Sequence, residues 1–528
     1  MTTHLDLHDI QGNIVKGYGR YGFPLARYVF LRVNRPLAGQ YFVLAIGQYI
    51  TSAVNWNDAG VEVPEATTNI AFTYAGLKNL GIPTQSLQSF PEEFAMGMKA
   101  RRDILGDDDV SAPSHWDPIW CSEEPVHIWI SINARTKATL ESRYQEIVAL
   151  VADSEGGVEQ LAGHRGDDGA EDLPYQDAAA ILSEAGTPTP KEHFGYTDGI
   201  SNPFFKGCGS DPENVIGGGK PTRGDPATMA GWAPLETGEF ILGYRDEALE
   251  YPKAPIPRLL SYNGTFMVFR KLHENVGAFN RYLGNTGKDF PGGEAALAAK
   301  FAGRWRNGAP LALFPNEADA EAFERKLTEA KMALRNAGNE QEKQAAKQAY
   351  LKLRTQSVGF NFNDDLDGSA CPLAAHTRRT NPRGSLEFGE DAYNTPGALV
   401  NRRRILRRGL PYGQVKDGDR DDGNHGIIFM SLNADIKRQF EFVQQQWMNY
   451  GNDFKQANDK DPILGNHSVD KSGQANGRMI IQAKADSDKP PFFCSRIPRL
   501  VETRGGDYFF IPSITALRMI GEGIIDPT

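Results

Sequence analysis

The stretch HFGYTDGISNP, residues 193–203, holds a single carboxylate, Asp198, between two glycines and directly before a turn-forming Ser-Asn-Pro. Gly195 and Gly199 permit backbone angles and close approaches that residues with a Cβ resist. A loop of this kind can hold an acidic side chain at a fixed position, directed into a cavity. Because Asp and Gly are common in ordinary turns, the stretch gains meaning only from what accompanies it along the chain.

Two segments farther along the chain carry residues that complement an acid. The segment DGSACPLAAH, residues 367–376, ends in a histidine that is followed by the basic run TRRTNPR, residues 377–383. The segment RILRRGLPYG, residues 404–413, places Arg407 directly after two aliphatic residues. An acid, a histidine and an arginine in this order, with these surroundings, resemble the dye-decolorizing peroxidases, a family of haem enzymes.

The composition is typical of a soluble globular protein with two or more domains. The chain has 528 residues, of which 40% are hydrophobic and 23% charged. Its net charge of −10 disfavours nonspecific binding of nucleic acid. Four well-separated cysteines without a CxxC pair are typical of a reducing compartment. No export signal and no apolar run of membrane-spanning length is visible, so we expect a cytoplasmic protein that binds neither nucleic acid nor membrane.

Hydrophobic periodicity predicts two successive sets of strands and helices. The first set has strands at residues 27–33, 69–74 and 126–132 and a helix at 136–152. The second set has strands at residues 239–244, 265–270, 426–432 and 507–511 and a helix at 436–450. Strands mixed with helices in two such sets indicate an α+β architecture. A charged segment, residues 316–355, is predicted to form one or two exposed helices interrupted at residues 336–339.

The resemblance implies a more specific fold. Members of that family pair two ferredoxin-like domains with antiparallel sheets, in an arrangement of the dimeric α+β barrel type, and hold haem mainly in the second domain. We therefore expect an N-terminal ferredoxin-like domain at residues 1–207 that ends in the Asp198 loop. A C-terminal ferredoxin-like haem domain is expected at residues 208–528, with the charged helical segment as an insertion at about residues 316–355.

The resemblance also implies how the cofactor is held. His376 is expected to be the axial ligand to the iron of haem b, a role that a neutral imidazole fills in haem peroxidases. Asp461 is expected to accept the other ring N–H of this histidine, with Glu441 as the alternative. Arg379 and Arg383, in the basic run after His376, are candidates to pair with the haem propionates.

On the side where peroxide would bind, the resemblance implies a joint role for Asp198 and Arg407. A carboxylate can accept a proton and return it, and a guanidinium, charged at every working pH, stabilises negative charge as the O–O bond breaks. Gly409 stands where one subfamily carries a distal asparagine, so we expect no asparagine to take part here.

These expectations define a haem peroxidase that reduces hydrogen peroxide and oxidises dyes, phenols and similar small one-electron donors. Two alternatives stay open. A chlorite dismutase-like haem enzyme shares the general fold but lacks a distal aspartate, and a haem-binding or haem-delivery protein would show peroxidase activity only incidentally. The physiological reductant, the oligomeric state and the Tyr or Trp residues that would carry radicals are left open by the sequence.

Overall fold

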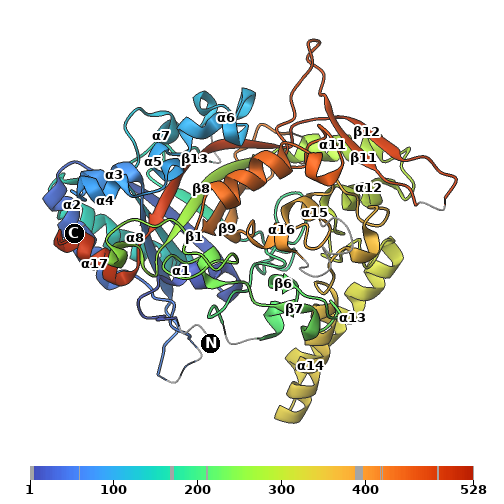
Figure 1. Cartoon of the computed structure of the whole chain (residues 1–528), viewed down its shortest axis with the longest axis horizontal. Coiled ribbons are helices and arrows are strands. Elements are labelled where there is room, and N and C mark those ends of the chain that lie inside the picture. Colours follow the sequence, from blue (N-terminus) through green and yellow to red (C-terminus); the bar gives the residue numbers. More distant parts are fainter. Residues whose placement is uncertain are drawn as a thin grey trace.

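A computed structural model of the protein describes residues 5–56, 58, 60–166, 170, 172–209, 212–386, 397–416, 418, 420–484 and 487–526 (Figure 1). The strands are β1 (Leu25–Val33), β2 (Ala66–Phe72), β3 (Ile128–Ala134), β4 (Val158–Gln160), β5 (Gln176–Ala179), β6 (Lys220–Pro221), β7 (Trp232–Ala233), β8 (Thr265–Glu274), β9 (Leu406–Tyr412), β10 (Gly426–Asn433), β11 (Gly477–Ile481), β12 (Phe492–Ile497) and β13 (Val501–Ile511).

The α-helices are α1 (Gly12–Val15), α2 (Pro36–Ile46), α3 (Tyr74–Asn79), α4 (Thr84–Gln88), α5 (Glu92–Met96), α6 (Arg102–Leu105), α7 (Pro118–Cys121), α8 (Lys137–Ala152), α9 (Val215–Gly218), α10 (Arg258–Ser261), α11 (Val276–Thr286), α12 (Gly293–Ala302), α13 (Glu317–Asn336), α14 (Glu340–Gln356), α15 (His376–Thr380), α16 (Ala398–Asn401) and α17 (Ile514–Glu522). Two π-helical segments, η11 (Lys437–Glu441) and η12 (Val443–Met448), follow β10.

One antiparallel sheet runs through the middle of the molecule. Its strand order is β4-β1-β3-β2-β13-β8-β10-β9, and β5 also pairs with β1. Strands from residues 25–179 form one half and strands from residues 265–511 form the other. The halves join where Phe510 of β13 pairs with Phe72 of β2. The predicted α+β class with antiparallel sheets is confirmed.

The helix predicted at residues 136–152 is observed as α8, and its local sequence explains why it forms. The Thr136 side chain caps the helix by accepting a hydrogen bond from the N–H of Thr139 at 3.1 Å. Leu140, Tyr144 and Ile147 recur at helical spacing and are buried. With α2, α8 covers the face of the first half-sheet, and α17 from the C-terminal end packs beside α2 (Figure 1).

Two segments differ from their prediction. Residues 239–244 are not a strand, because the N–H groups of Phe240 and Ile241 both bond to the Thr237 carbonyl at 3.0 Å, which forms tight turns. These residues are apolar because they are buried. An apolar run indicates burial in a turn as readily as burial in a strand. Residues 436–450 are helical as predicted but have π-helical turns, and such turns are frequent at functional sites.

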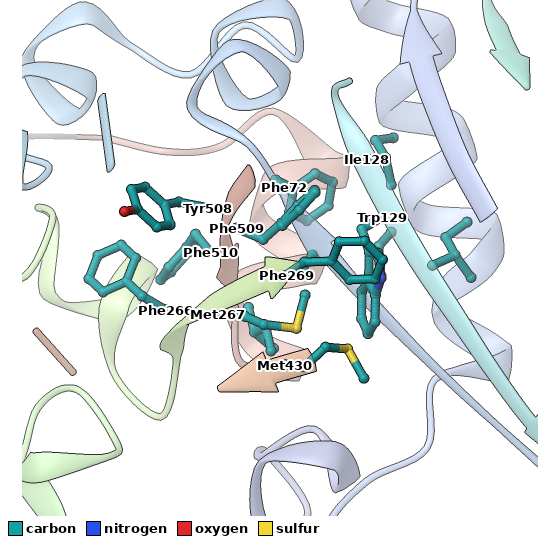
Figure 2. Packing of buried hydrophobic residues seen from close by; sticks show 14 of the residues in the cluster. Phe72, Ile128, Trp129, Phe266, Met267, Phe269, Met430, Tyr508, Phe509 and Phe510 are labelled. Carbon is teal, nitrogen blue, oxygen red and sulfur yellow. The ribbon is translucent and has the colours of Figure 1, made fainter. Parts of the chain in front are cut away.

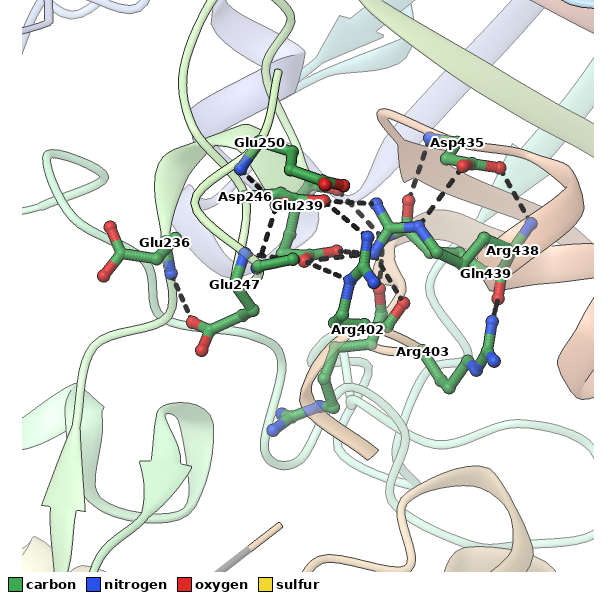
Figure 3. Close-up of polar contacts among 12 residues, drawn as sticks. Glu236, Glu239, Asp246, Glu247, Glu250, Arg402, Arg403, Asp435, Arg438 and Gln439 are labelled. Carbon is green, nitrogen blue, oxygen red and sulfur yellow. Dashed lines mark hydrogen bonds and ion pairs between the residues drawn. The ribbon is translucent and has the colours of Figure 1, made fainter. Parts of the chain in front are cut away.

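A buried ionic cluster ties the loop after β7 to η11 and to the segment that leads into β9 (Figure 3). Arg438 bonds to Glu239 at 2.9 Å and Arg402 bonds to Asp246 at 2.8 Å, and both carboxylates are buried. Burial raises the pKa of Glu239, while the charge of Arg438 opposes that rise. The cluster therefore anchors the chain directly before Arg404, one of the residues of the cavity described below.

The charged segment at residues 316–355 forms the two helices α13 and α14, which project from the body as a hairpin (Figure 1). Each helix begins at an asparagine cap, Asn316 accepting from the N–H of Asp319 and Asn339 from the N–H of Glu342. The predicted helices and their interruption are confirmed. No helix of the described residues is both long enough and apolar enough to cross a membrane.

The core lies between the two half-sheets and is rich in aromatic rings (Figure 2). Phe269 of β8 is 1% exposed. Its ring centroid lies 5.7 Å from that of Tyr28, 5.3 Å from Phe30 and 5.8 Å from Trp120, all in the first half, and 6.5 Å from Phe509 of β13. One side chain thus packs both halves together.

Phe269→Ala is expected to lower the free energy of unfolding by about 3–5 kcal/mol, because it removes a buried ring and leaves a cavity. The shift of the denaturation midpoint in guanidinium chloride measures this loss. Leu37→Ala, at a position that is 70% exposed, is the matched control and should change the midpoint little. Equal midpoints for the two variants would contradict the central place of Phe269 in the core.

Candidate active site

A cavity in the second half of the molecule has an empty volume of about 1770 Å³, part of it open to solvent. Four of the residues predicted from the sequence line it, namely Asp198, His376, Arg383 and Arg407. Most of the wall is apolar and includes Phe194, Ile200, Leu272, Trp305, Phe360, Phe362, Ile428, Phe429, Phe440, Val443, Met448, Ile463 and Leu464. The π-helical segment η12 supplies part of this wall.

Asp198 and Arg407 form an ion pair in the wall. Arg407 Nη1 donates to Asp198 Oδ1 at 2.8 Å, and Nη2 donates to the Ile200 carbonyl at 3.1 Å. Asp198 Oδ1 also accepts from the N–H of Gly199 at 2.5 Å. Gly195 and Gly199 have φ angles of 92° and 72°, a region that favours glycine, so both glycines shape the loop. The acid and the guanidinium are both partly exposed to the cavity.

His376 begins α15 and is held by Asp461. Its Nδ1 donates to Asp461 Oδ2 at 3.0 Å, while Asp461 Oδ1 accepts from the N–H groups of Ile463 at 2.8 Å and Leu464 at 2.7 Å. Burial by itself raises the pKa of Asp461, but the charge and hydrogen bond of His376 and the backbone donors lower it overall. Asp461 is therefore a buried carboxylate that fixes the proton of His376 on Nδ1 and leaves Nε2 for a ligand.

Glu441, the alternative partner for the histidine, is engaged elsewhere. Its carboxylate accepts from Arg101 Nε at 2.5 Å and Nη2 at 2.6 Å, and from the hydroxyl of Tyr508 at 2.9 Å. Of the two candidates that the sequence left open, the structure brings only Asp461 to His376.

Three buried arginines in the cavity wall, Arg304, Arg383 and Arg404, have no carboxylate partner among the described residues. Burial lowers the pKa of Arg304 and of Arg404 to about 10, and lowers the pKa of Arg383 well below its usual range. The charges of Arg304 and Arg404 add to the effect on Arg383. Their donors reach the carbonyls of Gly218, Gly219, Ser201, Gly308, Ser357, Val358 and Phe360 and the Ser201 hydroxyl. The wall thus carries surplus positive charge that an anion can balance.

Arg379 is not brought to the cavity. Its guanidinium is fully buried behind α15 and donates to the carbonyls of Trp447 at 2.8 Å, Tyr450 at 3.1 Å and Asp459 at 2.8 Å. Because backbone carbonyls occupy its donors, Arg379 holds α15 in place, and the expectation that it contacts a cofactor carboxylate does not fit its position.

Gly409 is required by the sheet itself. A Cβ at this position would lie 2.0 Å from the Ile428 carbonyl of the neighbouring strand, and its φ angle is 140°. A larger side chain at this position would clash with that carbonyl.

Sequence reasoning missed Arg304 and two carboxyl groups in the cavity wall, Glu192 and Glu274. The segment GRWRNG around Arg304 carries no local signal, because its meaning depends on burial without a partner.

An apolar cavity that offers one imidazole to a metal and surplus positive charge to an anion suits a haem protein, and the acid in the same wall suits a peroxidase. Comparisons with known proteins agree with a haem peroxidase and point to one group of such enzymes. The profile of the DyP dimeric alpha+beta barrel domain matches residues 9–165. A dye-decolorizing peroxidase of Mycena epipterygia is 27% identical over 479 residues, which cover 87% of this chain and 76% of that protein.

A multifunctional dye peroxidase of an Amycolatopsis species is 28% identical over 351 residues, which cover 62% of this chain and 61% of that protein. Among solved structures, an ancestral D-type dye decolorizing peroxidase superposes with a TM-score of 0.70 and 26% identity, over 98% of this chain and 99% of that one. Residues 9–165 thus match a domain of the dye-decolorizing peroxidases, and the chain as a whole is similar to proteins of that kind. The similarity to this group of haem enzymes supports a haem cofactor.

Proposed function

We propose that the protein is a haem b peroxidase that reduces hydrogen peroxide and oxidises phenols and dye-like one-electron donors. The observation that carries this proposal is that one cavity unites the Asp461-held imidazole of His376 with the ion pair of Asp198 and Arg407. A chlorite dismutase-like activity is disfavoured, since such an enzyme lacks the aspartate.

The residues of the cavity fit haem b. The described residues contain no cluster of three or more His, Cys, Asp or Glu side chains able to hold a metal ion. An iron bound by His376 would therefore take its remaining ligands from a porphyrin, as in haem proteins. Two propionates would offset two of the three unpaired charges of Arg304, Arg383 and Arg404. The sequence has no CxxCH for covalent attachment, which favours haem b.

The bound haem would supply peroxide activation and the storage of two oxidising equivalents. Asp461 would keep the proton on His376 Nδ1 and so make Nε2 a stronger electron donor. The Asp198 carboxylate would accept a proton from the bound peroxide and return it to the leaving oxygen, which departs as water. Arg407 would stabilise the charge that develops as the O–O bond breaks, and its 2.8 Å hydrogen bond would hold the acid in position.

The purified protein loaded with haem tests this proposal directly. A Soret band is expected, with rapid spectral change on addition of hydrogen peroxide and turnover of a phenolic dye. The rate of haem transfer to an apo-acceptor should be slow by comparison. Fast transfer together with negligible dye turnover would favour a haem-delivery protein instead.

Asp461→Asn is expected to weaken haem retention about 10–100-fold, because the amide cannot carry the negative charge that supports the ligand. The same change should raise the reduction potential of the iron, measured by redox titration. Asp459→Asn is the matched control, since this nearby carboxylate pairs with Arg478 at 3.3 Å. A potential and retention equal to wild type in Asp461→Asn would contradict the role of Asp461.

A further inference from the structure

Two carboxyl groups that the proposed mechanism does not use, Glu192 and Glu274, lie next to each other in the cavity wall. Glu192 precedes the Asp198 loop, and its two oxygens accept from the N–H groups of Phe194 and Tyr196, both at 2.7 Å. Glu274 ends β8 and is 5% exposed. The N–H of His193 reaches Glu274 Oε2 at 3.4 Å, directly before the N–H of Phe194 that reaches Glu192, so adjoining N–H groups of one loop hold the two carboxyl groups close together. Two buried carboxyl groups at one site, with no cation paired to either, favour a state in which one of them keeps a proton.

The surroundings of the pair favour retention of that proton. Burial raises the pKa of Glu192 to about 7 and that of Glu274 well above its usual range, and the charge of Asp198 acts in the same direction. No basic side chain of the described residues forms an ion pair with either group. The other titratable groups nearby are Tyr196 and His193 on the Asp198 loop, His273 on β8, His425 before β10 and Glu502 on β13.

The chemistry of the reaction creates a need for stored protons. Reduction of one hydrogen peroxide to two waters consumes two electrons and two protons. A phenol releases a proton with each electron that it gives, whereas ferrocyanide gives an electron alone. Asp198 carries one proton at a time, so an electron-only donor requires that the acid be reloaded within each cycle.

We propose that the pair of Glu192 and Glu274 is a proton store that reloads Asp198 while the oxidised centre is reduced. Asp198 is a carboxylate again once the leaving oxygen has departed as water. While the oxidised centre is reduced, the pair would pass its shared proton to Asp198, and Asp198 would deliver it to the second water being formed. The second proton of that water would come from solvent by the same route after the pair has been refilled. The pair is left as two carboxylates and is refilled from solvent. This inference rests on the proposed peroxidase function.

If the pair stores a proton, the rate of ferrocyanide oxidation should depend on pH. The pair holds its proton below the pH at which Glu192 titrates, about 7, and loses it as the pH rises through that value. Oxidation of ferrocyanide should therefore decline as the pH rises through about 7. Oxidation of a phenol should decline less, because the phenol brings its own proton.

Glu274→Gln in the haem-loaded full chain tests the store, because the amide keeps the shape of the side chain but has no proton to transfer. Oxidation of ferrocyanide should slow by at least about tenfold and lose its decline near neutral pH, with a much smaller effect on phenol oxidation. Glu192→Gln should give the same split between donors. In infrared difference spectra, without peroxide or donor, the carbonyl band of the shared protonated carboxyl should disappear in both variants.

Glu502→Gln is the matched control, since its carboxylate lies outside the cavity wall and accepts from Asn275 Nδ2 at 2.8 Å. This variant should keep the wild-type band and both rates. If Glu274→Gln slows both donors equally with an unchanged pH profile, or keeps the carbonyl band, the store is refuted while the peroxidase stands. A wild-type protein that does not react with peroxide would overturn the proposed function and the store together.

Discussion

His376→Ala is expected to abolish or strongly weaken haem retention and to erase peroxidase activity. No other histidine of the described residues combines a buried carboxylate on Nδ1 with a place in the cavity wall. Without the imidazole the iron would lose its protein ligand, and the apolar wall alone would hold the porphyrin weakly. The ratio of Soret to protein absorbance after gel filtration measures retention.

Two further variants separate ligand loss from misfolding. His115→Ala removes an exposed histidine and should keep wild-type haem content and activity. In His376→Gly, added imidazole should enter the vacated space and restore part of the haem spectrum and activity. Normal haem content with an unchanged spectrum in His376→Ala would overturn the ligand assignment.

Asp198→Asn is expected to slow the reaction of the haem with hydrogen peroxide by on the order of 10²-fold or more. The amide keeps the shape of the side chain and can still contact Arg407, but it cannot accept a proton from peroxide. Arg407→Leu should also slow the reaction, through lost stabilisation of charge and through release of the acid from its 2.8 Å bond. Stopped-flow absorbance under single-turnover conditions measures both rates.

If Asp198→Asn reacts at the wild-type rate while Arg407→Leu does not, then Arg407 is the essential residue and the role of Asp198 is wrong.

Local patterns in the sequence predicted local structure well. Helix α8 followed from apolar residues at helical spacing behind the Thr136 cap, and the α13–α14 hairpin from charge and two asparagines. An apolar run cannot distinguish a strand from buried turns, so the strand predicted at residues 239–244 was wrong. Such signals act over a few residues and therefore reveal elements, whereas the contacts between elements have no equally simple signature.

The site illustrates this limit. Asp198 and Arg407 are 209 residues apart in the chain, and His376 and Asp461 are 85 apart. Only the resemblance to a known family indicated these residues as members of one site, and their assigned roles are still predictions. Arg304 was missed because its significance arises from burial without a counter-charge, which only a folded chain displays.

Strand β13 belongs to both halves of the sheet, since it pairs along its length with β8 and, at Phe510, with β2. The helix that follows it, α17, lies on α2 at the opposite end of the chain. Swinging one half away from the other would break this shared strand and undock its helix. The molecule is thus built without a hinge between its halves, so reactants reach the cavity through its opening to solvent and not by a movement of one half against the other. By the same reasoning, neither half expressed alone should fold as an autonomous unit.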